Sequence, residues 1–467
     1  MGLHVNRILN FKKIKAIGLD MDYTLVRYHS EAFETLSFNV VVKKLIQLKN
    51  YPEEINSFKF DYKRAIRGLV IDKKRGNLLK VGLYSKVKMS YHGTKLLNYE
   101  EQEQTYQNMV IDLNDPQYFC IDTPFSISHA VLFSNLVDLK DKKPQLNLPD
   151  YDTLASDVLE LIDLAHRDDS LKSAVRKDIA KYIIQDPDCV SALEEFKKHG
   201  KKIWVITNSD YSYCKLLLDY TITPFLKNHQ HWSELFDLVI TLADKPKFFT
   251  EKYMRYLKID RATEQMSNLI GPIKEGVFQG GSAFQLQRDL KLSGDEILYI
   301  GDHMYGDIVS LKKAWNWRTA LVIDELEHEM ESLKVGAPLR SEINKHMHEK
   351  EKCETKLDDL YGKKLSVKGN SEKENAYARE IDEQFKLIHE HDQKISQYIK
   401  KYQELFNPYW GEIMRAGAEE SRFAGQIEKY ACIYICKIGD FKNYSPRKYF
   451  RPRKRFLPHE IIEFDAL

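Results

Sequence analysis

The chain has 467 residues, of which 43% are hydrophobic and 30% charged, and this composition is typical of a soluble globular protein of about two to four domains. The net charge of +2 excludes a chain that is basic or acidic as a whole, so neither nucleic acid nor a membrane surface is an expected partner. The six cysteines form no C-x-x-C pair, and no run reaches the ~18 consecutive apolar residues of a membrane span, so a reducing, cytoplasmic location is expected.

Residues 14–20, IKAIGLD, read as a buried strand that ends in a carboxylate. Four further apolar runs follow, separated by helix-like segments, within residues 199–210, 235–249, 294–308 and 318–323. Strands that alternate with helices predict an α/β fold with a parallel sheet covered on both faces. In such sheets ligands bind beyond the carboxyl ends of the strands, and polar residues follow three of these runs.

From about residue 325 the composition shifts to Lys, Glu and His. A weaker helix is expected over 341–361, a turn over 363–372, and then a helix with apolar residues at heptad-like spacing, namely Ile381, Phe385, Ile388, Ile395, Ile399, Tyr402 and Phe406. This pattern predicts a helical hairpin that packs on itself or on a partner subunit. The basic, aromatic segment 442–456 is either a solvated surface or a nucleic-acid patch, and the first is favoured.

Four short motifs stand at the predicted strand ends, in the order D-x-D-x-T, T-N-S, a lysine within DKPKFF, and G-D-H-x-x-x-D. Each motif alone is weak, and the two aspartates of the first could simply form a turn or cap a helix. Together they place carboxylates, hydroxyl groups and an ammonium group at one edge of the sheet. Two close carboxylates favour a bound cation, or a pair in which one group keeps its proton.

The segments DMDYTL, TNSDYSY, KPKFF and GDHMYGDI resemble the cytosolic purine 5′-nucleotidase family that prefers IMP and GMP, within the haloacid dehalogenase-like superfamily. The resemblance runs from about residue 15 to residue 325. It implies a Rossmann-like core over 1–30 and 191–330, a cap inserted over 31–190 that selects the substrate, and a helical hairpin with a C-terminal extension over 331–467.

The motif residues suit a two-step phosphoryl transfer. Asp20 is the expected nucleophile, because an ionised carboxylate can attack phosphorus and form an aspartyl-phosphate. Asp22 is the expected general acid and then base. The resemblance favours Lys245 over Lys202 and Lys247 as the lysine that would neutralise charge on the phosphoryl group and on Asp20.

A Mg²⁺ ion is the expected cofactor, because this ion prefers oxygen ligands. Its ligands would be Asp20, the backbone carbonyl of Asp22, and Asp302, while Asp307 would orient Lys245 or a metal-bound water.

Substrate contacts follow from the T-N-S motif and from the resemblance. Thr207, Asn208 and Ser209 would contact phosphate oxygens. The resemblance places Phe125 against the purine and adds Asp163, His166 and Lys172 as contacts to base, ribose or phosphate, although each of these is otherwise an ordinary cap residue.

The chain also departs from the family. Where the family carries an arginine, an asparagine and a tyrosine near the base, this chain has Leu159, Ser126 and Arg167, so the preferred nucleotide stays open. Tyr305, Lys313 and Arg318 fit the family's activating nucleotide site, whereas Asp112 and Asp122 add negative charge that would repel an anionic effector.

These observations predict a Mg²⁺-dependent phosphomonoesterase that acts on purine nucleoside 5′-monophosphates and forms a homo-oligomer, either a dimer or a tetramer. The aspartyl-phosphate could also be passed to another nucleoside. Two alternatives stay open: a phosphatase of the same fold that takes another small phosphate ester, and a non-catalytic scaffold protein.

Overall fold

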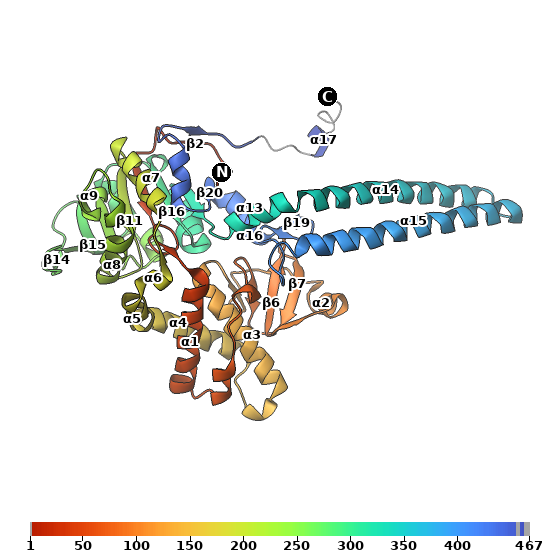
Figure 1. Cartoon of the computed structure of the whole chain (residues 1–467), viewed down its shortest axis with the longest axis horizontal. Coiled ribbons are helices and arrows are strands. Elements are labelled where there is room, and N and C mark those ends of the chain that lie inside the picture. Colours follow the sequence, from red (N-terminus) through yellow and green to blue (C-terminus); the bar gives the residue numbers. More distant parts are fainter. Residues whose placement is uncertain (1, 454–457, 462–467) are drawn as a thin grey trace. The chain divides into compact units, whose positions relative to one another are not determined.

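The five predicted strands lie side by side in the middle of a ten-stranded sheet (Figure 1). They are parallel and follow the order β17-β16-β3-β11-β12. Because Leu19 at the end of β3 is in register with Val205 and Ile300, the residues that follow these strands meet at one edge. The prediction of a parallel α/β sheet is confirmed, and the strands are β3 (Ala16–Leu19), β11 (Lys202–Ile206), β12 (Leu238–Thr241), β16 (Ile297–Gly301) and β17 (Arg318–Val322).

Both faces of this sheet are buried, as near-continuous apolar strands predict. Successive side chains of a strand point to opposite faces, and β11 shows this directly. Ile203 and Val205 belong to one apolar cluster, whereas Trp204 and Ile206 belong to another. Helices such as α7 (Pro187–Lys198) and α8 (Tyr211–Thr221) contribute to the first cluster.

The outer strands come from parts of the chain that the sequence pattern did not identify as strands. On one side lie β20 (Ile433–Ile435), parallel to β17, and β1 (Leu3–Val5), antiparallel to β20. On the other side lie β15 (Gly276–Gly280), β13 (Tyr256–Ile259) and β14 (Met266–Asn268). Strands this short carry too few residues to show a period.

The structure describes residues 2–453 and 458–461, and it divides into two units. One unit consists of Met1–Glu327 and Ile413–Leu467, and the other is His328–Glu412. Residues from 413 onward therefore fall with the core through β20, rather than with the helical hairpin as expected for 331–467. The basic segment 442–456 lies partly outside the described residues. None of the helices described is long and apolar enough to cross a membrane.

Most of the expected cap forms a second, antiparallel sheet and three long helices. The sheet has the order β8-β7-β6-β5-β9, and α1 packs against α3 and α4. Asp150 begins α4 by accepting a hydrogen bond from the backbone N–H of Thr153. These elements are β5 (Val70–Asp72), β6 (Asn77–Val81), β7 (Val87–His92), β8 (Lys95–Leu96), β9 (Tyr118–Cys120), α1 (Ser30–Lys49), α3 (Ile127–Lys142) and α4 (Tyr151–Arg167).

Shorter elements complete both units. The helices are α2 (Tyr99–Tyr106), α5 (Ser170–Lys177), α6 (Ile179–Tyr182), α9 (Trp232–Leu235), α10 (Lys247–Thr250), α11 (Ala283–Asp289), α12 (Ser310–Trp315), α13 (Leu326–Val335), α16 (Arg422–Tyr430) and α17 (Pro458–Ile461). The strands are β2 (Leu9–Asn10), β4 (Arg27–Tyr28), β10 (Ile183–Ile184), β18 (Arg415–Ala416), β19 (Glu419–Glu420) and β21 (Tyr449–Phe450).

The second unit contains the predicted hairpin, in which α14 (Ala337–Ser366) and α15 (Ser371–Gln403) run side by side (Figure 1). The turn is shorter than the expected 363–372, because α14 continues to Ser366 and Asn370 caps α15 through Lys373 N–H. Ile381 and Ile395 are buried between the helices, as expected. Phe385 and Ile399 are not, with 48% and 37% of their surface exposed, and Gln384 is buried in their place. Along part of α15 the buried positions therefore differ by one residue from those predicted.

The hairpin supplies a stability prediction. We expect Ile395→Asp to separate α14 from α15, because an unpaired charge in a buried position costs several times RT, typically ~3 kcal/mol or more. Limited proteolysis should then cut within residues 337–403 at much lower protease concentration. Ile399→Asp, one turn along the exposed flank, should leave the cleavage pattern unchanged. Equal sensitivity of both variants would contradict the assignment of the buried seam.

Candidate functional site

The strand ends bring a lysine and two aspartates into contact. Asp20 follows β3, and its Oδ1 lies 2.7 Å from Nζ of Lys245, which lies beyond the end of β12. The same ammonium group lies 2.8 Å from Oδ1 of Asp307 and 3.1 Å from the hydroxyl oxygen of Tyr299. Lys245 is therefore fully engaged by the groups around it, whereas Lys247 pairs at the surface with Asp244.

The segment after β16 supplies Asp302 and Asp307. Asp307 lies in a π-helical turn, Met304–Val309, and its Oδ2 accepts a hydrogen bond from the backbone N–H of His303 at 3.2 Å. A Cβ atom on Gly301 would lie 2.5 Å from the Asp307 carboxylate. The glycine of the G-D-H-x-x-x-D motif therefore leaves room for the second aspartate of that motif.

The carboxylates of this site are buried together. Burial raises the pKa of Asp20 well above its usual range; Lys245 opposes this rise, while Asp307, Asp302 and Asp22 add to it. Burial, with Asp307, raises the pKa of Asp302 to about 6. Burial alone would lower the pKa of Lys245, but Asp20 and Asp307 raise it above its usual value. The ammonium group of Lys245 therefore compensates only part of the negative charge of these carboxylates.

The remaining negative charge suits a cation. Within residues 2–453 and 458–461, Asp20, Asp302 and Asp307 are the one set of three potential metal ligands whose oxygen atoms all lie within 4.8 Å of one another. Such oxygen donors are the ligands that Mg²⁺ prefers. A divalent cation fits this donor set, because it would relieve the mutual repulsion of the carboxylates.

Asp22 lies beside this cluster and is held by two hydroxyl groups. Tyr28 donates to its Oδ1 at 2.6 Å, and Ser209 donates to its Oδ2 at 2.8 Å. Burial raises the pKa of Asp22, and the hydrogen bonds from Tyr28 and Ser209 oppose that rise.

The T-N-S residues follow β11 and are engaged in different ways. Thr207 is fully buried, and its hydroxyl oxygen accepts a hydrogen bond from Ser209 N–H at 3.0 Å. Thr207 therefore stabilises the loop after β11 and does not line the cavity. Asn208 lines the cavity, but its side chain bridges the backbone of Lys245, accepting from N–H at 2.7 Å and donating to the carbonyl at 3.1 Å.

The four aspartates, Lys245, Asn208 and Ser209 line one cavity of about 880 Å³, which extends to α3 and α4. Phe125 lies at its wall, with ring centroids 4.6 Å from Tyr23 and 5.0 Å from His166. Burial lowers the pKa of His166 to about 4, so this ring is neutral near pH 7. Asp163 and Leu159 both line the cavity from α4, one helical turn apart.

Lys172 also lines the cavity, but its ammonium group pairs with Asp210 at 2.5 Å. Asp210 caps α8 by accepting from Tyr213 N–H. Lys172 therefore stabilises the start of α8, and a bound anion would compete with Asp210 for its ammonium group. The exposed Arg167 donates to the backbone carbonyl of Asp163.

Several residues of this site were not predicted from the sequence. Thr123 donates to Asp302 Oδ2 at 2.9 Å. Arg67 is 1% exposed, donates to the Asp302 carbonyl at 3.0 Å, and pairs with Glu325. Both come from the cap, and no strand-end motif marks them. Tyr28 and Tyr299 were not predicted either, because a single tyrosine in a sequence belongs to no recognisable motif.

The residues of the expected effector site lie in consecutive elements, with Tyr305 in the π-helical turn, Lys313 in α12 and Arg318 in β17. Tyr305 is 55% exposed and lines the main cavity. The Lys313 ammonium group lies 6.0 Å from the ring centroid of Tyr430. Asp122 Oδ1 is buried without a hydrogen-bond partner among the described residues.

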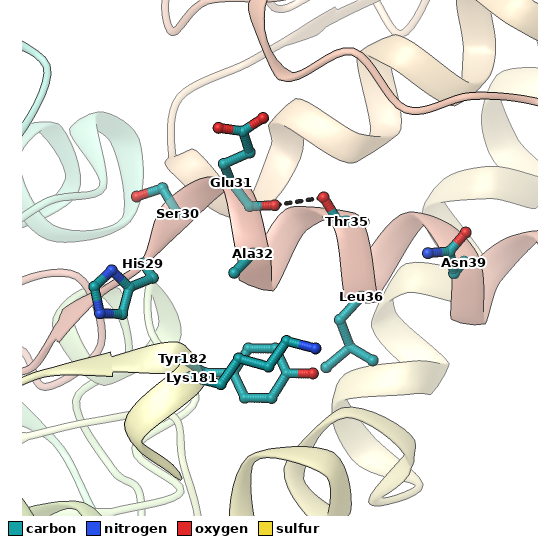
Figure 2. A pocket seen from close by; sticks show the side chains of 9 residues that line it. All are labelled: His29, Ser30, Glu31, Ala32, Thr35, Leu36, Asn39, Lys181 and Tyr182. Carbon is teal, nitrogen blue, oxygen red and sulfur yellow. Dashed lines mark hydrogen bonds between the residues drawn. The ribbon is translucent and has the colours of Figure 1, made fainter. Parts of the chain in front are cut away.

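A second hollow of about 660 Å³ lies along the start of α1, between that helix and Tyr182 (Figure 2). Its polar lining includes Lys181 and a single carboxylate, Glu31. Because Glu31 has no second carboxylate beside it in this lining, the second hollow lacks the cluster of carboxylates that marks the main cavity.

Comparisons with known proteins identify a family that this chain resembles. Residues 3–462 match the profile of a family described as the 5′ nucleotidase family. A 5′-nucleotidase domain-containing protein of Dictyostelium discoideum is 27% identical over 476 residues, which cover 98% of this chain and 74% of that protein. The 5′-nucleotidase domain-containing protein 2 of Homo sapiens is 26% identical over 477 residues, covering 98% and 85%.

Proposed function

The chain belongs to the 5′ nucleotidase family and is an enzyme of that class, and from this premise we propose that it hydrolyses purine nucleoside 5′-monophosphates of the IMP and GMP type to nucleoside and phosphate. We place its core in the haloacid dehalogenase-like superfamily, with Mg²⁺ as cofactor. The observation that carries the proposal is the contact of Asp20 with Lys245 at 2.7 Å beside Asp302 and Asp307.

In the first step Asp20 attacks phosphorus, and the bond from phosphorus to the 5′-oxygen breaks. Asp22 gives its proton to that oxygen, so that the nucleoside leaves as an alcohol. In the second step Asp22 takes a proton from water, the water oxygen attacks the aspartyl-phosphate, and Asp20 is released with phosphate. Lys245 holds positive charge against Asp20 and the phosphoryl oxygens throughout.

Asp20, the Asp22 carbonyl and Asp302 are the proposed ligands of the cation, with Asp307 orienting Lys245 at 2.8 Å. When bound, a magnesium ion supplies charge neutralisation between the nucleophile and the phosphate. Asn208 is the proposed phosphate contact through its second amide hydrogen, whereas the Ser209 hydroxyl donates to Asp22 and Thr207 accepts from the Ser209 N–H.

The far end of the cavity is the proposed base site. Phe125 offers a ring face, Asp163 offers acceptors for base N–H groups, and neutral His166 lines the cavity beside Phe125. Leu159 contributes no hydrogen-bond donor at this end, and Phe125 and Asp163 are the proposed determinants of the choice among purine nucleotides. A cytoplasmic location, a homo-oligomer and transfer of the phosphoryl group to a second nucleoside complete the proposal.

A phosphate-release assay over a panel of nucleoside monophosphates and small phosphate esters tests the proposal. Purine 5′-monophosphates should be the best substrates, because only they fill both the phosphate end and the base end of the cavity. If a small ester without a base is hydrolysed with the higher kcat/KM, the enzyme is a phosphatase for another substrate.

The base site makes a further prediction. Phe125→Ala should raise KM for IMP and GMP roughly tenfold or more, because stacking of a base on an aromatic ring contributes about 1–3 kcal/mol. Hydrolysis of p-nitrophenyl phosphate, followed by absorbance, should hardly change. If both substrates lose activity equally, Phe125 only packs the cap against Tyr23 and His166.

A further inference from the structure

The surroundings of Asp22 contain a hydrogen-bonded pair of tyrosines. Tyr28 donates its hydroxyl proton to Asp22 at 2.6 Å, and the Tyr213 hydroxyl lies 3.1 Å from the Tyr28 hydroxyl. A tyrosine has one hydroxyl proton. Because Tyr28 gives that proton to Asp22, Tyr213 is the donor of the second bond.

The pair is buried and its rings are fixed. Tyr28 is 2% exposed and Tyr213 is 3% exposed, so solvent has little access to either ring. The Tyr28 ring packs against Tyr23, Phe33 and Phe125, with centroids 4.8, 5.0 and 6.0 Å away. Tyr213 is carried by α8, whose first turn is held by the ion pair of Lys172 with Asp210.

We propose that Tyr28 is a positioning residue, which fixes the direction of the Asp22 carboxyl group, and that Tyr213 fixes the direction of the Tyr28 hydroxyl. This inference rests on the proposed function, in which Asp22 first gives and then takes a proton. Tyr28 and Ser209 each occupy one lone pair, on different oxygens of Asp22, and each oxygen keeps a second one for the transferred proton. The two hydroxyl groups thus set the plane of the carboxyl group while leaving it able to react.

The test removes the hydroxyl group and keeps the ring. We expect Tyr28→Phe to lower kcat/KM for IMP, which reports the steps up to formation of the aspartyl-phosphate, roughly 10- to 100-fold, a part of the 10²- to 10⁴-fold that a positioned acid supplies. For p-nitrophenyl phosphate, whose leaving group needs no proton, kcat/KM should fall less than about threefold, because this ratio excludes the second step that both esters share. Tyr213→Phe should change the same ratio in the same direction, by a smaller factor.

Tyr182→Phe is the matched control. The Tyr182 ring packs on Phe33, with centroids 6.5 Å apart, and the side chain lines the second hollow (Figure 2). Loss of this hydroxyl group should leave the ratio of the two kcat/KM values at the wild-type level. Thermal melting followed by circular dichroism shows whether each variant is folded.

The inference is overturned if folded Tyr28→Phe slows both esters equally or slows neither. Should Tyr28→Phe not fold, Tyr213→Phe decides in its place: an unchanged ratio overturns the inference. Asp22→Asn separates this inference from the proposed function. If Asp22→Asn does not discriminate between the esters, the acid role itself fails; if it discriminates and Tyr28→Phe does not, only the positioning role fails.

Discussion

Asp20→Asn is expected to abolish turnover while the protein stays folded. The amide has nearly the shape of the carboxylate but is not a nucleophile, and removal of a covalent nucleophile costs several powers of ten in kcat. The free energy of unfolding should not fall, because burial and the neighbouring carboxylates raise the pKa of Asp20 and so make its ionised form unfavourable in the folded state. Phosphate release and a thermal melt together check both parts.

The matched control is Asp244→Asn, the same chemical change at the rim of the same cavity. Asp244 pairs with Lys247 at the surface, and the distance is 2.9 Å. This variant should keep nearly full activity. If folded Asp20→Asn releases phosphate at the wild-type rate, the covalent mechanism is wrong, whatever the substrate proves to be.

Removal of divalent cations is expected to abolish activity, and added Mg²⁺ should restore it. Asp20, Asp302 and Asp307 lie within 4.8 Å of one another, and Lys245 compensates only part of their charge. Without a cation the approach of an anionic phosphate would be strongly opposed. Phosphate release in a chelator, followed by titration with Mg²⁺, measures the effect.

Asp302→Ala should then raise the Mg²⁺ concentration needed for half-maximal rate by at least about tenfold, as loss of a metal ligand typically does. Removal of an exposed carboxylate on α14, in Asp358→Ala, should leave that concentration unchanged. A chelated wild-type enzyme that stays fully active would show that these carboxylates serve another purpose.

The sequence alone determined the central sheet and most of the charged residues beside it. Apolar runs that end in polar residues identify parallel strands, because a strand buried on both faces needs an apolar side chain at nearly every position. The carboxyl ends of parallel strands meet at one edge, so order along the chain predicted that Asp20 and Asp302 lie together, and the family resemblance added Lys245 to them. The helical hairpin followed in the same way from its period.

Only the tertiary structure decided which groups touch. The contacts of Thr123 with Asp302 and of Arg67 with the Asp302 carbonyl join residues 31–190 to the core, across separations that no local pattern records. The sequence likewise did not predict the place of β20 in the main sheet or the exposure of Phe385. Periodicity reports which face of an element is apolar, whereas the partner of that face depends on how distant parts of the chain pack together.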